Sequence, residues 1–236
     1  MPKSASKAIA QGVGEKVMAE CNQSKMHHVT KFLDFTAPFY DLFFKLWLQR
    51  DNDFRRRVVE LMNLTGEESI LDVGCGTGTL TSMLAQEMNG RGGIFGIDLL
   101  PKMVEVAKKK ARKHGSRVEY EVGSSLAIPF KDETFDVVVT SLVYHHLMSL
   151  REKVRTFAEI RRILKPEGRY VAAEFAKPTV GNVLIIHDSL IKSVPLFTPD
   201  LLEQNGFHIV GKRETIRGIT IVSAKKDAKY DNESFD

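Results

Sequence analysis

Hydrophobic and polar positions follow two alternating spacings from about residue 66 onward. Runs rich in β-branched and aromatic residues predict strands over 69–73, 94–97, 118–122 and 135–141, and a turn and strand within 164–175. Helical spacing covers 79–88 and a longer stretch from about 101 to the glycine at 115. This alternation predicts a parallel sheet with helices on both faces.

The last part of the predicted domain has a different pattern. Thr198 and Pro199 suit the N-cap and first position of a short helix, and Gly206 suits its C-cap. Two strand-like runs at 207–214 and 218–226 then follow without an intervening helix, which predicts an antiparallel hairpin. We therefore expect an α/β fold with a seven-stranded, mostly parallel sheet over 65–226. A helical lid segment over 1–64 would precede it, and a polar tail over 227–236 would follow.

Length and cysteine content exclude several classes of protein. The 236 residues are enough for one domain with a substantial core, and no window resembles a membrane span or a secretory signal, so we expect a cytoplasmic protein. Cys21 and Cys75 are the only cysteines, which favours neither a disulfide nor a structural metal site. The net charge of +4 is concentrated in a lysine-rich stretch at 102–117, which we interpret as a solvated helix face rather than a nucleic-acid site.

The stretch "ILDVGCGTGTL" at 70–80 places Gly74, Gly76 and Gly78 directly behind a predicted strand. A loop without Cβ atoms at the carboxyl edge of a parallel sheet lets a ligand approach the backbone. The dinucleotide fingerprint fails, because its third glycine would fall on Thr79 or Thr81.

Two carboxylates indicate which ligand the glycines accommodate. Asp72 lies inside the motif, where it is unhelpful to a pyrophosphate but suits a positively charged group. Asp98 ends the second predicted strand, where a carboxylate can accept hydrogen bonds from both hydroxyls of a ribose. The two carboxylates together suit a nucleoside that carries a cation and no diphosphate.

These residues belong to a set of motifs that resembles class I S-adenosylmethionine-dependent methyltransferases. The matching stretches are "LDVGCGTG", "GIDLLPKMVEVAKKKA", "VEYEVGSSLAIPFKDETFDVVVTS" and "EIRRILKPEGRY", in the family's order over about 66–175. Within that superfamily, "FYDLFF", "AIPFKDETFD" and "AEFAKP" are similar to the ubiquinone/menaquinone C-methyltransferases. The resemblance implies a Rossmann-like fold and S-adenosyl-L-methionine as the cofactor.

The resemblance also implies roles for individual residues. Gly74, Gly76, Thr77 and Gly78 would form the loop beneath the methionine and ribose, with Asp72 orienting the loop or facing the amino-acid end. Asp98 would hold the ribose, while Leu99, Met103, Ser124 and Ser125 would contact the adenine and Ser141 the methionine side. In "YHHL", Tyr144 and His145 are candidates for a proton acceptor on the substrate side, against the alternative that this sequence is superfamily background.

The acceptor is less well defined by the sequence than the cofactor. Aromatic residues cluster at 32–47, and Tyr40 and Phe43 are candidates for a lid over an apolar acceptor; a helix packed on the core explains the cluster equally well. The chain between Pro178 and Pro199 is shorter than the corresponding segment of the quinone-pathway family, so the acceptor stays open.

We expect methyl transfer to a small apolar or aromatic molecule. The alternatives are an RNA or protein methyltransferase that uses the basic 102–117 helix, and a cofactor-binding protein without catalysis.

Overall fold

The computed structural model describes residues 52–88, 92–147, 149–175, 197–210, 214–216, 218–227 and 230. Its helices are α4 (Asn52–Met62), α5 (Thr79–Glu87), α6 (Pro101–His114), the 3-10 turn η2 (Tyr144–His146), α7 (Leu150–Ile163) and α9 (Pro199–Glu203). Its strands are β1 (Ser69–Val73), β2 (Gly93–Asp98), β3 (Glu119–Val122), β4 (Phe135–Ser141), β5 (Leu164–Phe175), β6 (Phe207–Ile209), β7 (Glu214–Ile216) and β8 (Ile219–Lys226). The predicted lid residues Tyr40 and Phe43, and nearly all of the segment between Pro178 and Pro199, lie outside these ranges.

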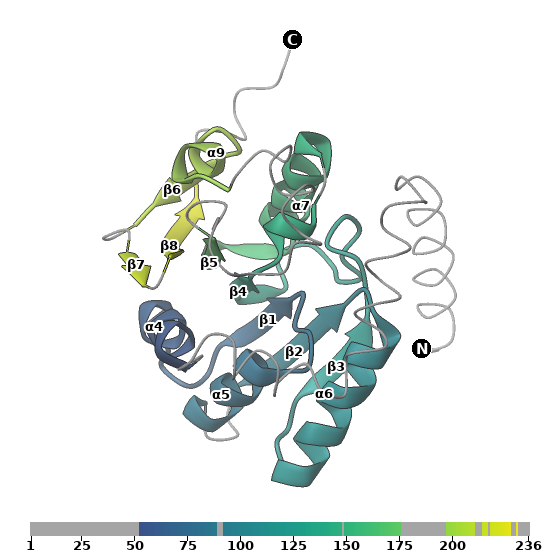
Figure 1. Cartoon of the computed structure of the whole chain (residues 1–236). Helices are drawn as coiled ribbons and strands as arrows, with labels where there is room; N and C mark the ends of the chain where they lie inside the picture. The colour runs from purple at the N-terminus through teal and green to yellow at the C-terminus, as the bar shows by residue number, and fades with distance from the viewer. Residues whose placement is uncertain are drawn as a thin grey trace.

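The strands form one mostly parallel sheet (Figure 1). Their order is β3-β2-β1-β4-β5-β8-β6, with β1 to β5 parallel to one another and β8 antiparallel to β5. This arrangement confirms the α/β, Rossmann-like fold and the antiparallel C-terminal strands.

The described sheet has eight strands rather than the expected seven, because the run at 207–214 contributes to two short strands. Both β6 and β7 pair antiparallel with β8, but their registers differ: Ile209 pairs with Ala224 and Glu214 with Ile221, a shift of two residues from one continuous ladder. A single strand cannot keep both registers, so the pairing is interrupted.

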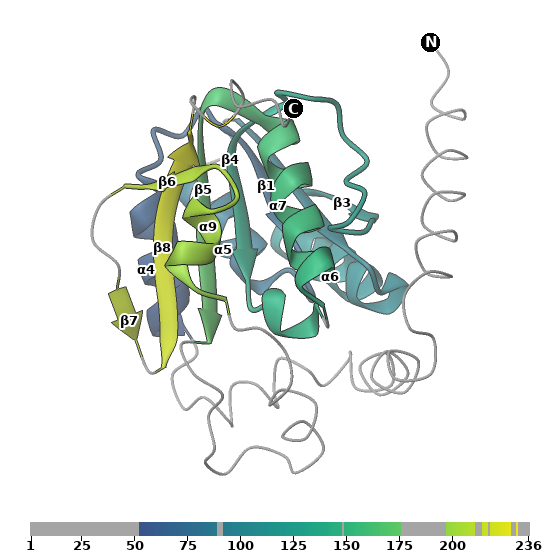
Figure 2. The ribbon, with the colours of Figure 1, turned by 90° about the horizontal axis from the view of Figure 1, so that it is seen from above.

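Helices cover both faces of the sheet (Figure 2), and a group of buried side chains lies on each face. On one face, α4 and α5 pack on the strands through Phe54, Val58, Met62, Leu80 and Leu84. On the other, α7 and α9 pack through Phe157, Ile160, Ile163 and Leu202. The α6 helix covers β3 through Val104, Ala107 and Ala111 around Tyr120. With both faces covered, the carboxyl ends of the parallel strands remain as the place for a ligand.

Local capping sets where the helices begin and end. Gly115, in the left-handed conformation at φ 65°, is the C-cap of α6, and Ser149 with Glu152 forms a capping box at the start of α7. Thr198 caps α9 as expected, accepting a hydrogen bond from the Leu201 N–H. The expectation for Gly206 was wrong: α9 ends earlier, with Gln204 as its C-cap.

Candidate functional site

The glycine loop, residues 74–78, connects β1 to α5 at the carboxyl edge of the sheet. The N–H groups of Gly74 and Cys75 both donate to the carbonyl of Ile97 on β2, at 2.8 and 2.9 Å, which fixes the loop to the neighbouring strand. Gly78 is the N-cap of α5 in the left-handed conformation at φ 75°, so the first turn of α5 begins directly at the loop. The first N–H groups of an α-helix have no partner within the helix, and this end of α5 lies at the loop.

Gly76 and Gly78 are glycines for different reasons. A Cβ on Gly78 would lie 2.6 Å from the Tyr120 hydroxyl, so the protein's own packing excludes a side chain there. A Cβ on Gly76 would meet no protein atom within 4 Å, although the residue has φ 54°. The open side of the loop is therefore at Gly76.

Asp98, the last residue of β2, lies against this loop. Its two carboxylate oxygens accept hydrogen bonds from the Gly76 N–H at 2.8 Å and the Leu100 N–H at 2.9 Å. Withdrawal from solvent raises the pKa of Asp98, and the two backbone donors oppose that rise. Asp98, the residue predicted to bind the ribose, thus also holds the loop and the start of α6 in place.

Asp72 lies beneath the loop on the face covered by α4 and α5. Its side chain is almost fully buried, and Oδ2 accepts a hydrogen bond of 2.6 Å from the Thr81 hydroxyl on α5. Its other oxygen, Oδ1, is buried without a hydrogen-bond partner among the described residues. Burial, opposed by the Thr81 hydroxyl and assisted by repulsion from Asp98, raises the pKa of Asp72 to about 7. Attraction to Arg55 also opposes the rise, but burial outweighs it, so a further positive group would stabilise the ionised carboxylate.

Three other residues predicted to bind the cofactor, Thr77, Leu99 and Met103, differ in how far they are buried. Thr77 is buried, and Lys110 on α6 donates to it at 3.5 Å and to Thr79 at 3.1 Å. Met103 is buried in the first turn of α6, and Leu99 follows Asp98 directly, half-exposed. Of these two residues, only Leu99 has a partly exposed side chain next to Asp98.

The serines predicted beside the adenine have protein partners. The Ser124 hydroxyl accepts from the Leu126 N–H at 3.1 Å, and the Thr156 hydroxyl on α7 donates to that of Ser125 at 3.1 Å. Both follow β3, whose neighbour in the sheet is β2. Ser141 ends β4, next to β1, and is half-buried.

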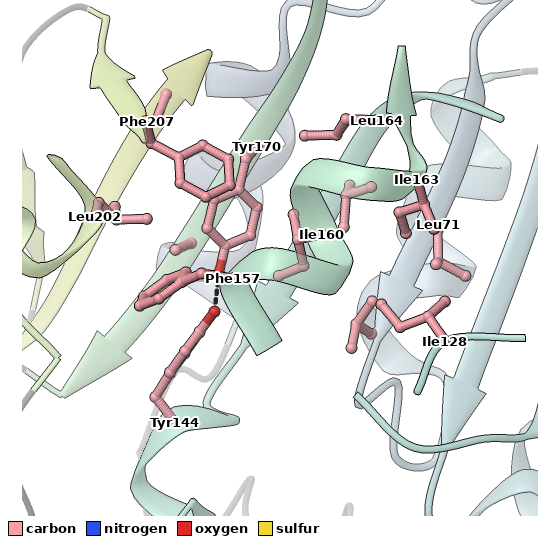
Figure 3. Close-up of a cluster of buried hydrophobic side chains, with 14 of the residues drawn as sticks. Leu71, Ile128, Tyr144, Phe157, Ile160, Ile163, Leu164, Tyr170, Leu202 and Phe207 are labelled. Carbon is pink, nitrogen blue, oxygen red and sulfur yellow. Dashed lines mark hydrogen bonds between the residues drawn. The ribbon is translucent and has the colours of Figure 1, made fainter. Parts of the chain in front are cut away.

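Tyr144 is placed in the core, away from where a substrate could reach it. Its ring stacks on Phe157 with centroids 4.9 Å apart, and it is about 1% exposed. Its hydroxyl receives a hydrogen bond of 3.0 Å from the Tyr170 hydroxyl, shown as the dashed line in Figure 3. Burial and the neighbouring Tyr170 raise the pKa of Tyr144 well above its usual value. We correct the expectation accordingly: the Tyr144 side chain is a packing residue and not a catalytic candidate.

His145, one residue further, points elsewhere. Its Nδ1 lies 2.9 Å from Oε1 of Glu174 on β5, and its ring is partly exposed. Glu174 is about 2% exposed and also accepts from the Tyr144 N–H at 2.7 Å. We call Ser141–His146 together with Glu174 the β4–β5 edge.

The sequence of this chain is similar to those of known proteins. A family model described as a methyltransferase domain matches residues 70–168. A demethylmenaquinone methyltransferase from Lactiplantibacillus plantarum is 32% identical over 73% of this chain and 73% of its own length. A ubiquinone/menaquinone biosynthesis C-methyltransferase from Citrifermentans bemidjiense is 33% identical over 61% of each chain. The chain belongs to the class I S-adenosylmethionine-dependent methyltransferases, close to the ubiquinone/menaquinone C-methyltransferase family.

A solved structure supports the fold of this methyltransferase independently. An S-adenosylmethionine-dependent methyltransferase from Aquifex aeolicus superposes with a TM-score of 0.61 at 22% identity, over 72% of this chain and 88% of that one. The family model and the curated relative show that the protein is an enzyme that uses S-adenosyl-L-methionine, which decides against the non-catalytic alternative. None of its described helices is both long enough and apolar enough to cross a membrane.

The basic stretch of the methyltransferase forms the outer side of α6. Its basic side chains other than Lys110 are exposed, and Lys109 pairs with Glu105 at 2.8 Å. This arrangement agrees with a solvated helix face.

Two polar residues of the site were missed in the sequence: Thr81 and Glu174. Glu174 had a signal, because a carboxylate stands inside the apolar run "YVAAEF". A charge within a buried strand needs a partner, which marks such a position as one to examine. Thr81 had no comparable signal, since a threonine in a helix commonly has no functional role.

Proposed function

We propose that the glycine loop with Asp72 and Asp98 binds S-adenosyl-L-methionine, and that the methyltransferase transfers its methyl group to a ring carbon of a hydroxylated aromatic or quinol acceptor. The observation that carries the cofactor site is the pair of carboxylates on either side of Gly76. Asp72 has a buried oxygen without a partner among the described residues, and Gly76 has open space where a side chain would stand. A cationic nucleoside suits both features.

The residues of the loop suit the parts of this cofactor. Bound, the cofactor supplies an activated methyl group on a positively charged sulfur. Asp72 offers negative charge to the cationic portion, and Asp98 offers two acceptor oxygens to the ribose hydroxyls. The present bonds of Asp98 to two N–H groups leave it further acceptor capacity, because an ionised carboxylate has about four lone-pair sites. Leu99 provides partly exposed apolar surface for the adenine, whereas Met103 is covered by the protein itself.

The acceptor class is supported by the relatives. One is named for demethylmenaquinone and another for C-methylation in ubiquinone and menaquinone biosynthesis. Both names describe acceptors with an aromatic or quinonoid ring. Methyl transfer to such a ring carbon requires that the carbon be electron-rich, as it is when the ring bears an ionised hydroxyl. Positioning and exclusion of water then supply most of the acceleration.

The acceptor is tested by incubating the full chain with methyl-labelled cofactor and a panel of acceptors. The panel contains reduced naphthoquinols and benzoquinols lacking one ring methyl, simple phenols, bulk RNA and a protein mixture. We expect label in the quinols or phenols, on carbon by NMR, and none in RNA or protein. Label only in RNA or protein would overturn the acceptor class.

A matched pair of variants checks that the labelling uses this site. Asp98→Ala should remove the labelling, whereas Glu119→Ala, an exposed carboxylate on β3, should retain it. Equal labelling by both variants would exclude the glycine loop as the cofactor site.

A further inference from the structure

The β4–β5 edge brings a histidine and a carboxylate together at the same end of the sheet as the glycine loop. Ser141 pairs with Ala173, so Glu174 on β5 lies one step beyond the end of β4. The edge also touches the loop, since a Cβ on Gly74 would lie 2.5 Å from Cγ2 of Val143. His145 therefore follows, by two residues, a side chain in contact with the glycine loop.

Two backbone N–H groups hold the carboxylate of Glu174 independently of His145. Oε2 accepts from the Tyr144 N–H at 2.7 Å, and Oε1 accepts from the Phe175 N–H at 2.9 Å. Burial opposes ionisation, but the imidazole of His145 and these two donors outweigh it and hold the pKa of Glu174 below its usual value. An ionised carboxylate only accepts hydrogen bonds, so the His145 Nδ1 that lies 2.9 Å from Oε1 must donate.

The turn that carries His145 is held from the core side as well. The buried Lys153 on α7 donates to the Tyr144 carbonyl at 2.7 Å, and burial lowers the pKa of this lysine. The Tyr144 ring is packed against Phe157 and Phe197. Both peptide groups of Tyr144 are thus bound to charged side chains, which fixes the backbone immediately before His145.

Within the part of the chain that the structure describes, charged and titratable groups near His145 come from three elements. Glu174 lies on β5, the ring of His146 is 3.9 Å away in η2, and Lys153 approaches from α7 through the Tyr144 carbonyl. Only Glu174 presents an acceptor to Nδ1 among these contacts.

We propose that Glu174 is a positioning residue that holds His145 with its proton on Nδ1, so that Nε2 is the base that takes the proton from the methyl acceptor. This inference rests on the proposed function. A hydroxylated ring gives its O–H proton to Nε2, and its ring carbon forms the new bond to the methyl group as the carbon–sulfur bond breaks. The electron pair of that bond stays on sulfur. The ring carbon then loses its own hydrogen as a proton to solvent while the hydroxyl is restored by proton return from the imidazolium.

The tautomer of His145 can be measured without any acceptor. Long-range nitrogen–proton NMR spectra of the full chain, labelled on histidine, distinguish the two neutral tautomers, and His145→Gln assigns the signal. We expect the Nδ1-protonated form in the wild type. A neutral ring protonated on Nε2 would overturn the proposal, whatever the enzyme methylates. Because this test uses the wild type, it does not depend on how well a variant folds.

Kinetics test whether the pair takes part in the reaction. Single-turnover rates of His145→Gln should fall by about 100-fold or more, and those of Glu174→Gln by at least about tenfold, because the amide no longer selects the tautomer. The acidic limb of the pH–rate profile should disappear in His145→Gln. Cofactor affinity, measured by calorimetry, should remain unchanged in that variant.

Two further comparisons separate this proposal from a structural role. The loss in His145→Gln should shrink as the acceptor hydroxyl becomes more acidic, since a pre-ionised acceptor needs no base. His208→Gln, an exposed histidine on β6, should keep the wild-type rate and pH profile. Wild-type rates in both His145→Gln and Glu174→Gln would overturn the proposal while leaving the proposed function intact. A wild type that methylates none of the quinols or phenols would instead overturn the proposed function.

Discussion

The glycine loop and the β4–β5 edge lie at one end of the same sheet but are specified in different ways. In the loop, the contacts that define the site are made by the backbone: N–H groups of Gly74, Cys75 and Gly76 bond to residues of β2. At the β4–β5 edge, the contacts that define the site are made by side chains. Tyr144 and His145 point in different directions there, although they are adjacent in the sequence. A site built from backbone conformation is visible in the sequence, whereas one built from side-chain direction needs the packing around it.

The largest effect on binding is expected at the glycine loop, where the cofactor is proposed to bind. Asp98→Ala should weaken cofactor binding by about 2–4 kcal/mol, because ribose hydroxyls lose a charged acceptor and two N–H groups lose theirs. Isothermal calorimetry measures this, with Glu119→Ala as the exposed control. Glu174→Gln should leave the affinity near the wild-type value. Equal losses in Asp98→Ala and Glu174→Gln would mean that the two regions are one site and that the comparison is wrong.

A second pair of variants distinguishes a steric clash with the ligand from strain in the backbone. Gly76→Ala and Gly115→Ala both place a Cβ in open space at positive φ, 54° and 65°, and each should cost about 1–2 kcal/mol of stability. Only Gly76→Ala should also reduce cofactor affinity, by about 1–3 kcal/mol, because its methyl group occupies the ligand's place. Thermal unfolding and calorimetry on both variants provide the data. Unchanged affinity in Gly76→Ala would place the cofactor elsewhere.

The pH dependence of cofactor binding tests Asp72. Its pKa of about 7 in the free protein should fall when a cation binds, so binding should release a proton and affinity should rise with pH up to about 7, by at most about tenfold per unit. Asp72→Asn should abolish this dependence. S-adenosylhomocysteine, which lacks the sulfonium charge, should show a weaker dependence if Asp72 faces the sulfur and the same dependence if it faces the amino group.

The same carboxyl affects the stability of the free protein with the opposite sign. A folded-state pKa raised above 3.8 means that Asp72 favours folding at low pH and that this contribution is lost as the pH rises toward about 7. Asp72→Asn should therefore flatten the stability profile across this range, as seen in urea titrations. A wild-type profile that does not depend on Asp72 would contradict the burial of its charge.

The smallest effect is expected for the hydroxyl of Tyr144. Tyr144→Phe removes the hydroxyl bonded to Tyr170 and should lower stability by about 1 kcal/mol, while both peptide groups that hold the turn remain. The methylation rate should be unchanged. A rate loss comparable to that of His145→Gln would mean that Tyr144 takes part in the reaction and is not only a packing residue.

Much of the fold could be predicted because its signals are local. The bounds predicted for β1 and β4 match those of the structure, since each is a short, mostly apolar run that ends at polar or glycine residues. The range 164–175, in contrast, was predicted to hold a turn and a strand, and it forms the single strand β5. The split of the 207–214 run into β6 and β7 could not be predicted, because it depends on the register against β8. The end of α9 was misplaced for a related reason: Gly206 has positive φ at 75° but serves the turn after the helix.

The sequence by itself determined the order of the elements, the glycine loop and the carboxylates at the ends of β1 and β2. Three glycines after a strand have few alternative explanations, because positive φ and close approach both require glycine. The tertiary structure decided that Tyr144 packs inward and that His145 meets Glu174. Tyr144 turns to the core because Phe157 and Phe197, from distant parts of the chain, form an aromatic site for it. His145 meets Glu174 because the pairing of β4 with β5 brings together residues 29 positions apart.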